Sequence, residues 1–546
     1  MTIVKEFWAL MWVWNDQIKA VLASVMHVFS PAALLKMQSA AEPVEKEVVN
    51  KKVKNQKRPS KYSKPQLIGL FIGPSLFIVI ELFVSPAEMP DEAITVLASI
   101  AWIATGWVTE AIPIPVTSLL PLLLFPMTGV METGEVSASY GDSLIFLFAG
   151  SFMIALSMEK WNLHRRVALS IISYVGTNPS TIILGFMIAT GFLSMWISNT
   201  ATTLMMVPIC LAVTKHVSDS LKHHTTMDTS PGKFPFGTAL MLGTAYSATI
   251  GGFGSIIGAP ANIILAGTVS SLYGVEITFA RWLLFGVPMV ILFVPLVWLY
   301  LTKIAYPLKV KEIPGGREII KKDLQELGKM SYEEKVVFTI FTLTAAAWIT
   351  RSFFLNKFIP GLDDTLIALL AGIILFLIPA KNKDGNIMDW NTALKLPWGI
   401  LWLFGGGLAL AAGIMNSGLD QWIGGQLTSF ENIPLFITIA LIVTLITILT
   451  EFTSNTATAT MVYPIVAVAA ASLGTDPIVL MVAANMGATF AYMFPVAAPP
   501  NAIVFGTGYV RMADMAKTGV WLNLFSIMFT VIVVYYYVPL IFGHLM

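Results

Sequence analysis

Long apolar runs separated by short polar connections dominate the chain from residue 66 onward. A helix needs about 20 predominantly apolar residues to cross the hydrocarbon core of a bilayer. Runs of this kind predict membrane spans at 66–85, 92–110, 112–130, 141–158, 236–268, 281–303, 336–354, 364–380, 398–415, 478–510 and 520–543. Two further apolar stretches, at 180–213 and 432–472, are interrupted near their midpoints by Ser-Asn-Thr. The pattern therefore predicts an all-α polytopic membrane protein with two irregular segments.

The distribution of lysine and arginine predicts the orientation of these spans, because cytoplasmic loops carry an excess of both. The basic or polar loops expected in the cytoplasm are 46–64, 164–166, 215–233, 305–335 and 381–383. They share one side only if both interrupted stretches turn back without crossing. The chain then has eleven spans and two re-entrant hairpins, with a cytoplasmic N-terminus and an extracellular C-terminus. The alternative is that each stretch forms one or two ordinary spans, which the charge pattern disfavours.

The two interrupted stretches carry nearly the same motif. Ser198–Ile209 reads SNTATTLMMVPI and Ser454–Ile465 reads SNTATATMVYPI, at an offset of 256 residues. The same offset pairs 147–150 (LFAG) with 403–406 (LFGG), while a third pair, GAPAN and AAPPN, follows at an offset of 239. In the threading above the two copies run in opposite directions. Inverted repeats with broken helices are typical of secondary transporters.

The repeat predicts the domain organisation. Residues 1–64 are expected to form an N-terminal cytoplasmic or interfacial segment, and 304–335 a cytoplasmic loop. The first inverted repeat would span 65–303, with its hairpin at 180–213 and a broken helix at 236–268. The second would span 336–546, with its hairpin at 432–472 and a broken helix at 478–510.

The Ser-Asn-Thr tips place oxygen ligands at membrane depth. Irregular backbone within a bilayer must be satisfied by protein or line a wet cavity. Hydroxyl, amide and freed carbonyl oxygens suit sodium, whereas helix N-termini attract carboxylates. No lysine or arginine flanks either motif, so a bound dianion would depend on helix ends, neutral donors and cations. Isolated serines and threonines here would be read as helix-packing residues, but two matching constellations favour a binding site.

Composition narrows the class of protein. Of 546 residues, 56% are apolar and 12% are charged, about half the charged fraction of a soluble protein. The net charge of +1 implies no nucleic-acid partner, and the single cysteine, Cys210, excludes an intramolecular disulfide. The sequence shows no convergent His, Cys or acidic cluster, which argues against a membrane enzyme. A channel or a membrane scaffold without a coupled cycle is a further alternative.

The paired motifs, with the GAPAN and AAPPN segments that follow, resemble the divalent anion/sodium symporter family over roughly residues 66–546. The resemblance implies a homodimeric elevator carrier of the plasma membrane, with a scaffold domain and a moving transport domain. Its implied cargo is a C4 dicarboxylate such as succinate, malate or fumarate, imported with sodium bound at two or more sites. A sodium-independent exchanger of the same fold, trading 2-oxoglutarate for malate, is the alternative. The intact hydroxyl and asparagine residues favour the symporter.

The resemblance also assigns roles to individual residues. The residues implied for the first sodium site are Ser194, Ser198, Asn199 and Gly258. Those implied for the second are Thr450, Thr453, Asn455 and Ala497. Those implied to contact the substrate are Asn199, Thr200, Asn455, Thr456 and Pro499. Ala498 stands where relatives commonly have threonine, so one hydroxyl donor is missing.

The sequence also predicts roles for three charged residues that lie in or beside the predicted spans. Glu451, three residues before the second Ser-Asn-Thr, would either tune cation affinity, bind a proton, or be a structural partner of a helix end. Arg351 is expected to snorkel at the outer end of its span. Asp142 is expected to cap the helix that it precedes.

Overall fold

The computed structural model describes residues 62–86, 88–173, 178–222, 228–308, 324–381, 385–427 and 433–543. These residues form helices and connections, without a named β-strand among them, which confirms the all-α class. The predicted N-terminal segment lies outside the described residues as far as residue 61, and the predicted loop 304–335 is described only at its ends.

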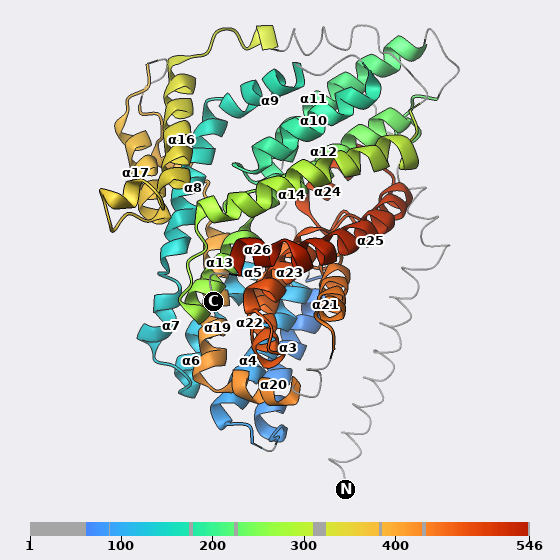
Figure 1. Ribbon diagram of the computed structural model, residues 1–546. Coiled ribbons are helices and arrows are strands. Elements are labelled where there is room, and N and C mark those ends of the chain that lie inside the picture. The colour runs from blue at the N-terminus through green and yellow to red at the C-terminus, as the bar shows by residue number, and fades with distance from the viewer. Residues whose placement is uncertain are drawn as a thin grey trace, which may run out of the picture. The chain divides into compact units, whose positions relative to one another are not determined.

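The first half of the described chain contains twelve α-helices and one π-helical turn, which are coloured blue to green in Figure 1. Their bounds are α3 (Lys64–Phe83), α4 (Asp91–Thr109), α5 (Ile114–Thr117), α6 (Leu120–Thr128), α7 (Thr133–Ser139), α8 (Ser143–Lys160), α9 (Leu163–Ser173), α10 (Pro179–Ser194), α11 (Asn199–Lys222), α12 (Pro235–Phe253), α13 (Pro260–Tyr273), α14 (Phe279–Leu299) and η1 (Tyr300–Ala305). The carboxylate of Asp142 accepts the backbone N–H of Leu144 at 2.9 Å. The predicted cap at the start of α8 is therefore confirmed.

The second half is also helical. Its elements are α16 (Tyr332–Thr350), the 3-10 turn η2 (Leu355–Lys357), α17 (Asp364–Leu377), α18 (Trp390–Ala393), α19 (Trp398–Asn416), α20 (Leu419–Leu427), α21 (Leu435–Thr450), α22 (Asn455–Ser472), α23 (Pro477–Thr489), α24 (Pro499–Phe505), α25 (Met512–Tyr536) and α26 (Val538–Phe542).

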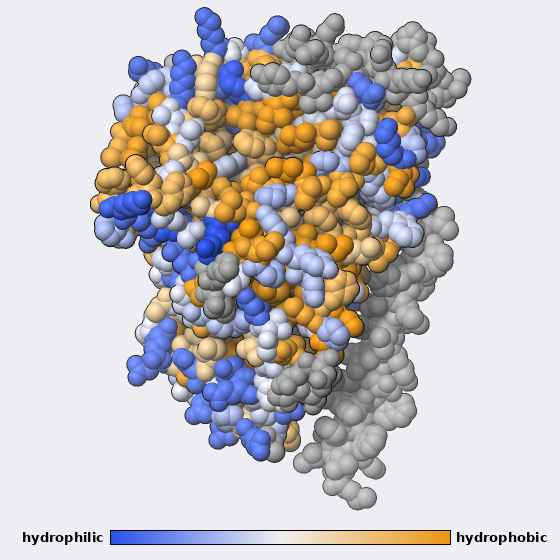
Figure 2. All heavy atoms as spheres, viewed as in Figure 1, coloured by the Kyte–Doolittle hydropathy of each residue, from blue (hydrophilic) through white to orange (hydrophobic). Residues whose placement is uncertain are grey.

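Several helices have the length and the surface of membrane spans. Among the described residues, seven helical segments are long and apolar enough to cross a bilayer, and five shorter apolar helices accompany them. Large apolar side chains are exposed on them, such as Phe71 at 72% and Leu445 at 69%. Figure 2 shows apolar side chains spread widely over one face of the protein. Such a surface fits hydrocarbon rather than water, so the chain is a multi-pass membrane protein.

Helix breaks occur at both Ser-Asn-Thr motifs, as predicted. The first break separates α10 from α11, and the second separates α21 from α22. The predicted broken helices are also present, as α12 followed by α13 and α23 followed by α24. The irregular stretches between them are short, which leaves carbonyl and N–H groups unpaired at membrane depth unless other parts of the chain or a ligand bind them.

Glycines let the first arm of each interrupted stretch pack closely on the next broken helix. α10 packs against α12, and α21 packs against α23. A Cβ atom at Gly251 would overlap the backbone of Gly191, and one at Gly487 would lie 3.2 Å from the carbonyl oxygen of Val443. The approach at Gly251 therefore requires glycine, whereas a side chain at position 487 would force its neighbours to move slightly. The second arms cross over, because α11 contacts α24 and α22 contacts α13. All four breaks therefore belong to one assembly of helices.

Two short helices that the hydropathy pattern did not predict connect the spans to the interrupted stretches. α9 follows α8, and α20 follows α19, and they begin at Leu163 and Leu419, which are separated by the same offset of 256 residues. The guanidinium of Arg166 in α9 binds the carboxylate of Glu334 at 2.8 Å. Neither helix has enough apolar residues for a span, which explains why a search for spans overlooks them.

Arg351 does not snorkel, and the expectation from the sequence was wrong. Its side chain is buried, with Nε 2.8 Å from Oδ1 of Asp364 and Nη2 2.6 Å from Oε1 of Glu276. The second carboxylate oxygen of Asp364 accepts the backbone N–H of Phe279 at 2.8 Å. These contacts join the start of α14 to the connection between α16 and α17. Acceptors distant in sequence therefore hold the arginine inside the protein.

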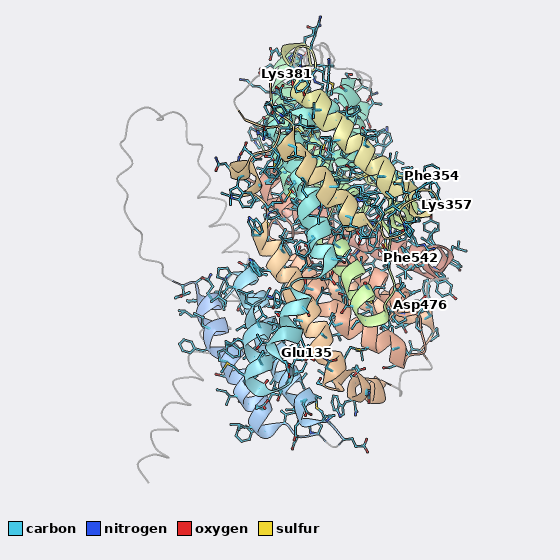
Figure 3. All side chains as sticks on the ribbon, turned by 90° about the vertical axis from the view of Figure 1, so that its left-hand side faces the viewer. Glu135, Phe354, Lys357, Lys381, Asp476 and Phe542 are labelled. Carbon is cyan, nitrogen blue, oxygen red and sulfur yellow. The ribbon has the colours of Figure 1, made fainter. Side chains whose placement is uncertain are left out.

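We expect Arg351→Ala to lower the midpoint of thermal unfolding clearly, because it leaves the buried carboxylate of Asp364 without its cation. Breaking one side of a buried ion pair costs about 3–5 kcal/mol. Unfolding of the purified protein in detergent, followed by intrinsic fluorescence, measures the change. Lys357→Ala is the matched control, because Lys357 is an exposed cation at the same end of α16 (Figure 3). Equal midpoints for the two variants would contradict the role of this ion pair.

Candidate functional site

The tip between α10 and α11 is closed by a hydrogen bond between two predicted ligands. The hydroxyl of Ser194 donates to Oδ1 of Asn199 at 2.6 Å. Oγ of Ser198 accepts the backbone N–H of Ala201 at 3.2 Å and so caps the start of α11. Ser194 is fully buried, whereas Ser198, Asn199 and Thr200 are half-buried. The amide oxygen of Asn199 therefore points back toward the carbonyl end of α10.

The tip between α21 and α22 repeats this arrangement. The hydroxyl of Thr450 donates to Oδ1 of Asn455 at 2.7 Å. Thr450 stands where Ser194 stands in the first copy, so a hydroxyl fills both positions. The amide nitrogen of Asn455 donates to the carbonyl oxygen of Thr489, at the end of α23, at 3.2 Å. The same hydroxyl-to-amide bond thus closes both tips and keeps each asparagine in one orientation.

Two asparagines hold the irregular segments of the broken helices. Nδ2 of Asn262 donates to the carbonyl oxygens of Gly252 and Ser255, at 3.0 and 2.8 Å. Nδ2 of Asn501 donates to the carbonyl oxygens ten and seven residues before it, both at 3.2 Å. The sequence offered a signal for this pair, because GAPAN and AAPPN both end in asparagine. The sequence alone did not indicate what either asparagine binds.

The first broken helix lies directly against the first tip. A Cβ atom at Gly252 would overlap the amide oxygen of Asn199, and one at Gly258 would lie 2.9 Å from the carbonyl oxygen of Ser194. The structure thus brings three of the residues predicted for the first sodium site together: Ser194, Asn199 and Gly258. The hydroxyl of the fourth, Ser198, caps α11 instead.

The residues predicted for the second sodium site are placed less uniformly. Thr450 and Asn455 are hydrogen-bonded to each other. The hydroxyl of Thr453 donates to the carbonyl oxygen of Leu449 at 2.9 Å and lies 2.6 Å from the hydroxyl of Thr458. Both of its partners therefore belong to the two helices that flank the second tip. Ala497 is buried in the irregular segment that precedes α24. The structure therefore joins two of these four residues by a direct bond.

Glu451 anchors the second broken helix to the second tip. Its buried carboxylate accepts three consecutive backbone N–H groups, those of residues 492–494, at 2.8 to 3.2 Å. It also accepts Nδ2 of Asn523 in α25 at 2.6 Å. Of the alternatives left open by the sequence, these contacts correspond to a structural partner of freed backbone groups.

The first copy makes the equivalent connection without a charge. Met195 stands 256 residues before Glu451, and its carbonyl oxygen accepts the hydroxyl of Ser255. The first copy therefore joins its broken helix to its tip through a hydroxyl and a carbonyl group, whereas the second copy uses a carboxylate and backbone N–H groups. Only the second copy places a carboxylate at this position.

Helix ends give both tips a polarised environment. α10 and α21 end at the tips, and their free carbonyl groups carry partial negative charge. α11 and α22 begin there with Asn199 and Asn455, so their first N–H groups carry partial positive charge. α13 and α24 begin with prolines, which have no N–H, and the N–H groups of Asn262 and Asn501 donate to the carbonyl oxygens of Ala259 and Ala498. This arrangement can bind cations on the carbonyl side and an anion on the N–H side.

A comparison with protein families identifies the family. The family model described as "Sodium:sulfate symporter transmembrane region" matches residues 64–543, which is most of the chain. The chain belongs to this symporter family. It is therefore a membrane transporter and not an enzyme.

Sequence relatives of this symporter are named for a narrower activity. A protein of Staphylococcus saprophyticus named "Sodium-dependent dicarboxylate transporter SdcS" is 50% identical over 493 residues, which covers 90% of this chain and 94% of the relative. A protein of the same name from Staphylococcus aureus is 48% identical over 491 residues, covering 89% and 94% of the two chains.

Two solved structures that are similar to the symporter are 12% identical to it in sequence. MtrF of Neisseria gonorrhoeae, described as one of a class of antimetabolite efflux pumps, has a TM-score of 0.51 at 12% identity, covering 87% of this chain and 96% of its own. YdaH of Alcanivorax borkumensis has a TM-score of 0.49 at 12% identity, covering 88% and 99%. The likeness to MtrF concerns the fold alone.

A cavity of about 620 Å³ opens beside the first tip of the symporter. Ser198, Thr200 and Leu204 line it from the second arm, and α8 lines the facing wall. Lys395, in the connection between α18 and α19, also lines it. The predicted substrate residue Thr200 is thus accessible from this cavity. Beside the second tip α19 packs against α22, where a Cβ atom at Gly407 would overlap Thr460.

An ion pair fixes the helices around this cavity. Nζ of Lys160, at the end of α8, lies 2.6 Å from Oδ2 of Asp389, which precedes α18. This bond holds the pKa of Asp389 below its ordinary value. The two walls of the cavity, α8 and the connection to α19, are therefore joined at one end. Ser198 and Thr200, which line the cavity at the first tip, are half-buried.

Proposed function

We propose that the protein imports C4 dicarboxylates, such as succinate, malate and fumarate, by symport with sodium. The observation that carries the proposal is the doubled tip, in which a hydroxyl and an asparagine oxygen meet at the carbonyl end of a helix. Oxygen ligands without net charge suit a weakly held hard cation such as sodium. The relatives named as sodium-dependent dicarboxylate transporters support the same cargo.

The proposed sodium ligands follow the two tips. Sodium would bind Ser194, Ser198, Asn199 and Gly258 in the first copy. It would bind Thr450, Thr453, Asn455 and Ala497 in the second. The dicarboxylate would contact Asn199, Thr200, Asn455, Thr456 and Pro499. α22 begins at Asn455 without a side-chain cap, which supports a carboxylate at the start of that helix.

Coupling follows from the charge balance of such a site. No lysine or arginine flanks either motif in the sequence, and in the structure Lys395 lines the cavity that Thr200 also lines. One lysine does not balance a dianion, so the dianion should bind best after the cations have bound. Each ligand then raises the affinity for the other, by the same factor in both directions. Two sodium ions neutralise a dianion, and a third would carry net charge. Moving that one net charge across the membrane contributes about 2.3 kcal/mol of driving force per 100 mV of membrane potential.

The proposed topology has eleven spans, two re-entrant hairpins, a cytoplasmic N-terminus and an extracellular C-terminus, in a homodimer. The cavity beside the first tip is lined by His164, which directly precedes Arg165 and Arg166, and by Lys395. Basic residues of this kind are expected on the cytoplasmic side. We therefore assign the structure to an inward-open state, in which α19 packs on α22 beside the second tip.

Alternation would exchange these two arrangements. In an outward-open state α8 would pack on α11 as α19 now packs on α22, and the contact between α19 and α22 would open. An elevator movement of the hairpins and broken helices past α8 and α19 would produce this exchange. The matching positions of the two copies, at an offset of 256 residues, support it.

The test is uptake of labelled succinate by proteoliposomes containing the purified protein. We expect uptake that requires an inward sodium gradient, exceeds the outside concentration, and is competed by malate and fumarate. Potassium in place of sodium and empty liposomes are the controls. Uptake that ignores sodium but requires internal dicarboxylate would assign the exchanger instead. Non-saturable flux would indicate a channel, and competition by sulfate alone would indicate an inorganic anion as cargo.

A further inference from the structure

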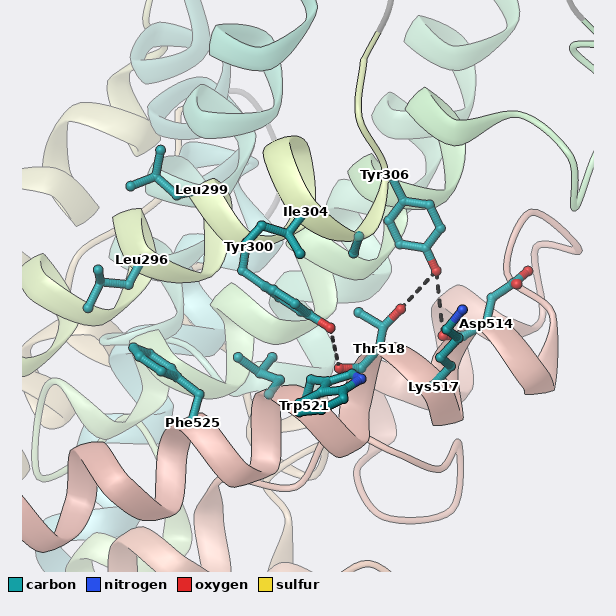
Figure 4. Close-up of a pocket in the computed structure, with 12 residues that line it drawn as sticks. Leu296, Leu299, Tyr300, Ile304, Tyr306, Asp514, Lys517, Thr518, Trp521 and Phe525 are labelled. Atoms are coloured by element: carbon teal, nitrogen blue, oxygen red, sulfur yellow. Dashed lines mark hydrogen bonds between the residues drawn. The ribbon is translucent and has the colours of Figure 1, made fainter.

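A second cavity, of about 650 Å³, lies between α14, η1 and α25 (Figure 4). None of the residues that line it belongs to either hairpin. It therefore serves neither proposed sodium site, and its chemistry has to be explained separately.

This cavity is a groove on the protein surface, and one end of the groove is apolar. Leu296 and Leu299 line it from α14, and Leu522 and Phe525 line it from α25. Leu299 is 43% exposed and Phe525 is 39% exposed, although both lie on helices long and apolar enough to cross a membrane. At such positions the surrounding medium is hydrocarbon. The apolar end is therefore suited to binding an acyl chain.

The other end of the groove carries polar groups that satisfy one another. The hydroxyl of Tyr300 donates to the carbonyl oxygen of Thr518 at 3.0 Å, and the hydroxyl of Tyr306 lies 2.9 Å from Oγ1 of the same residue. Both tyrosines come from the π-helical turn η1 or directly follow it. Turns of this kind occur frequently at functional sites. The two tyrosines hold η1 to α25 and form a firm wall.

Lys517 provides charge at the rim of this polar end. Its side chain is exposed, one helical turn before Trp521, which is 62% exposed. The nearby carboxylate of Asp514 is occupied by Arg511, with Nε–Oδ2 at 2.6 Å and Nη2–Oδ1 at 2.9 Å. Asp514 therefore does not neutralise Lys517. A lysine followed by an exposed tryptophan is typical of the boundary between headgroups and hydrocarbon.

We propose that this groove binds an acidic phospholipid, with its phosphate beside Lys517 and an acyl chain along Leu299 and Phe525. The order of polar and apolar residues along the groove matches the order of headgroup and chain in one lipid molecule. The chain continues from Tyr306 into a segment rich in lysine and arginine, which predicts the cytoplasmic face. Anionic lipids are attracted to basic groups at that face.

Lipid retention by the whole protein tests the proposal. The protein is reconstituted into nanodiscs of equal parts phosphatidylglycerol and phosphatidylcholine, extracted in mild detergent, and its bound lipids are counted by native mass spectrometry. We expect the wild-type protein to retain phosphatidylglycerol in preference. Lys517→Gln should retain about fivefold less, the loss expected when one lysine near a charged surface is removed. Leu299→Trp, which fills the apolar end, should retain less of both lipids.

Lys335→Gln is the matched control, because Lys335 is an exposed lysine on α16, outside the groove. It should retain both lipids at the wild-type level. Wild-type retention of phosphatidylglycerol by Lys517→Gln and by Leu299→Trp would overturn the proposal. Equal retention of the two lipids by the wild-type protein would remove its acidic specificity. Displacement of phosphatidylglycerol by inorganic phosphate alone would assign an anion site without an acyl chain.

Discussion

Asn199→Ala and Asn455→Ala are each expected to abolish sodium-driven uptake while the protein still reaches the membrane. Each amide oxygen accepts the hydroxyl that closes its tip, at 2.6 and 2.7 Å. In the proposed site each amide also serves a sodium ion and a carboxylate. A hydrogen bond to a charged group contributes about 1.5–3 kcal/mol. Removing an amide that serves two such partners should therefore lower uptake about a hundredfold or more.

The measurement is initial succinate uptake, normalised to the amount of protein in the membrane. Asn391→Ala is the matched control, since Asn391 is an exposed asparagine on α18 and lies outside both tips. Uptake close to the wild-type rate by either tip variant would remove the proposed roles of that asparagine. A loss of membrane protein equal to the loss of uptake would instead assign it a purely structural role.

The second large effect should come from a disulfide between Ser151→Cys and Leu204→Cys, which is expected to stop uptake completely. These positions correspond, 256 residues earlier, to Gly407 and Thr460, which are in contact where α19 packs on α22. Ser151 belongs to α8, and Leu204 is 56% exposed and lines the cavity beside the first tip. The two cysteines should meet only when α8 closes over α11, so the disulfide would trap the outward-open state.

Uptake is measured before oxidation, after oxidation and after reduction, in a protein with Cys210→Ala so that no other thiol reacts. Each single cysteine variant is a control and should stay active after oxidation. The reductant should restore uptake by the double variant. Full uptake by a completely cross-linked protein would contradict the proposed exchange, and so would a failure of the two cysteines to react during turnover.

The sequence predicted the positions of the functional breaks well. Ser-Asn-Thr marks the start of α11 and α22, because the asparagine of each motif begins the second arm. The offset of 256 residues also holds for the first arms, which start at Pro179 and Leu435. Local chemistry is sufficient here. A short polar triplet within an apolar stretch must break the helix or leave polar groups facing lipid.

Contacts between residues far apart in the chain could not be predicted from the sequence in this way. Arg351 was expected to snorkel because its acceptors, Glu276 and Asp364, come from connections that only the fold brings together. The bonding of Asn262 could not be predicted from the repeat, because its Oδ1 accepts a hydrogen bond from Nδ2 of Asn485, on another helix, at 2.9 Å. A repeated letter in the sequence indicates that a position matters. It does not reveal the atoms to which that side chain is bonded.

The contact of Gly252 with Asn199 restricts how related carriers can be recombined. No side chain fits between the tip and the broken helix, so the two surfaces have to be inherited as one piece. A chimera joined within the polar loop 215–233 would pair a tip from one parent with a break from another. Junctions before Pro179 and after Tyr273 keep the piece whole. A chimera that receives this segment whole keeps the contact between Gly252 and Asn199 and includes the proposed substrate residues Asn199 and Thr200.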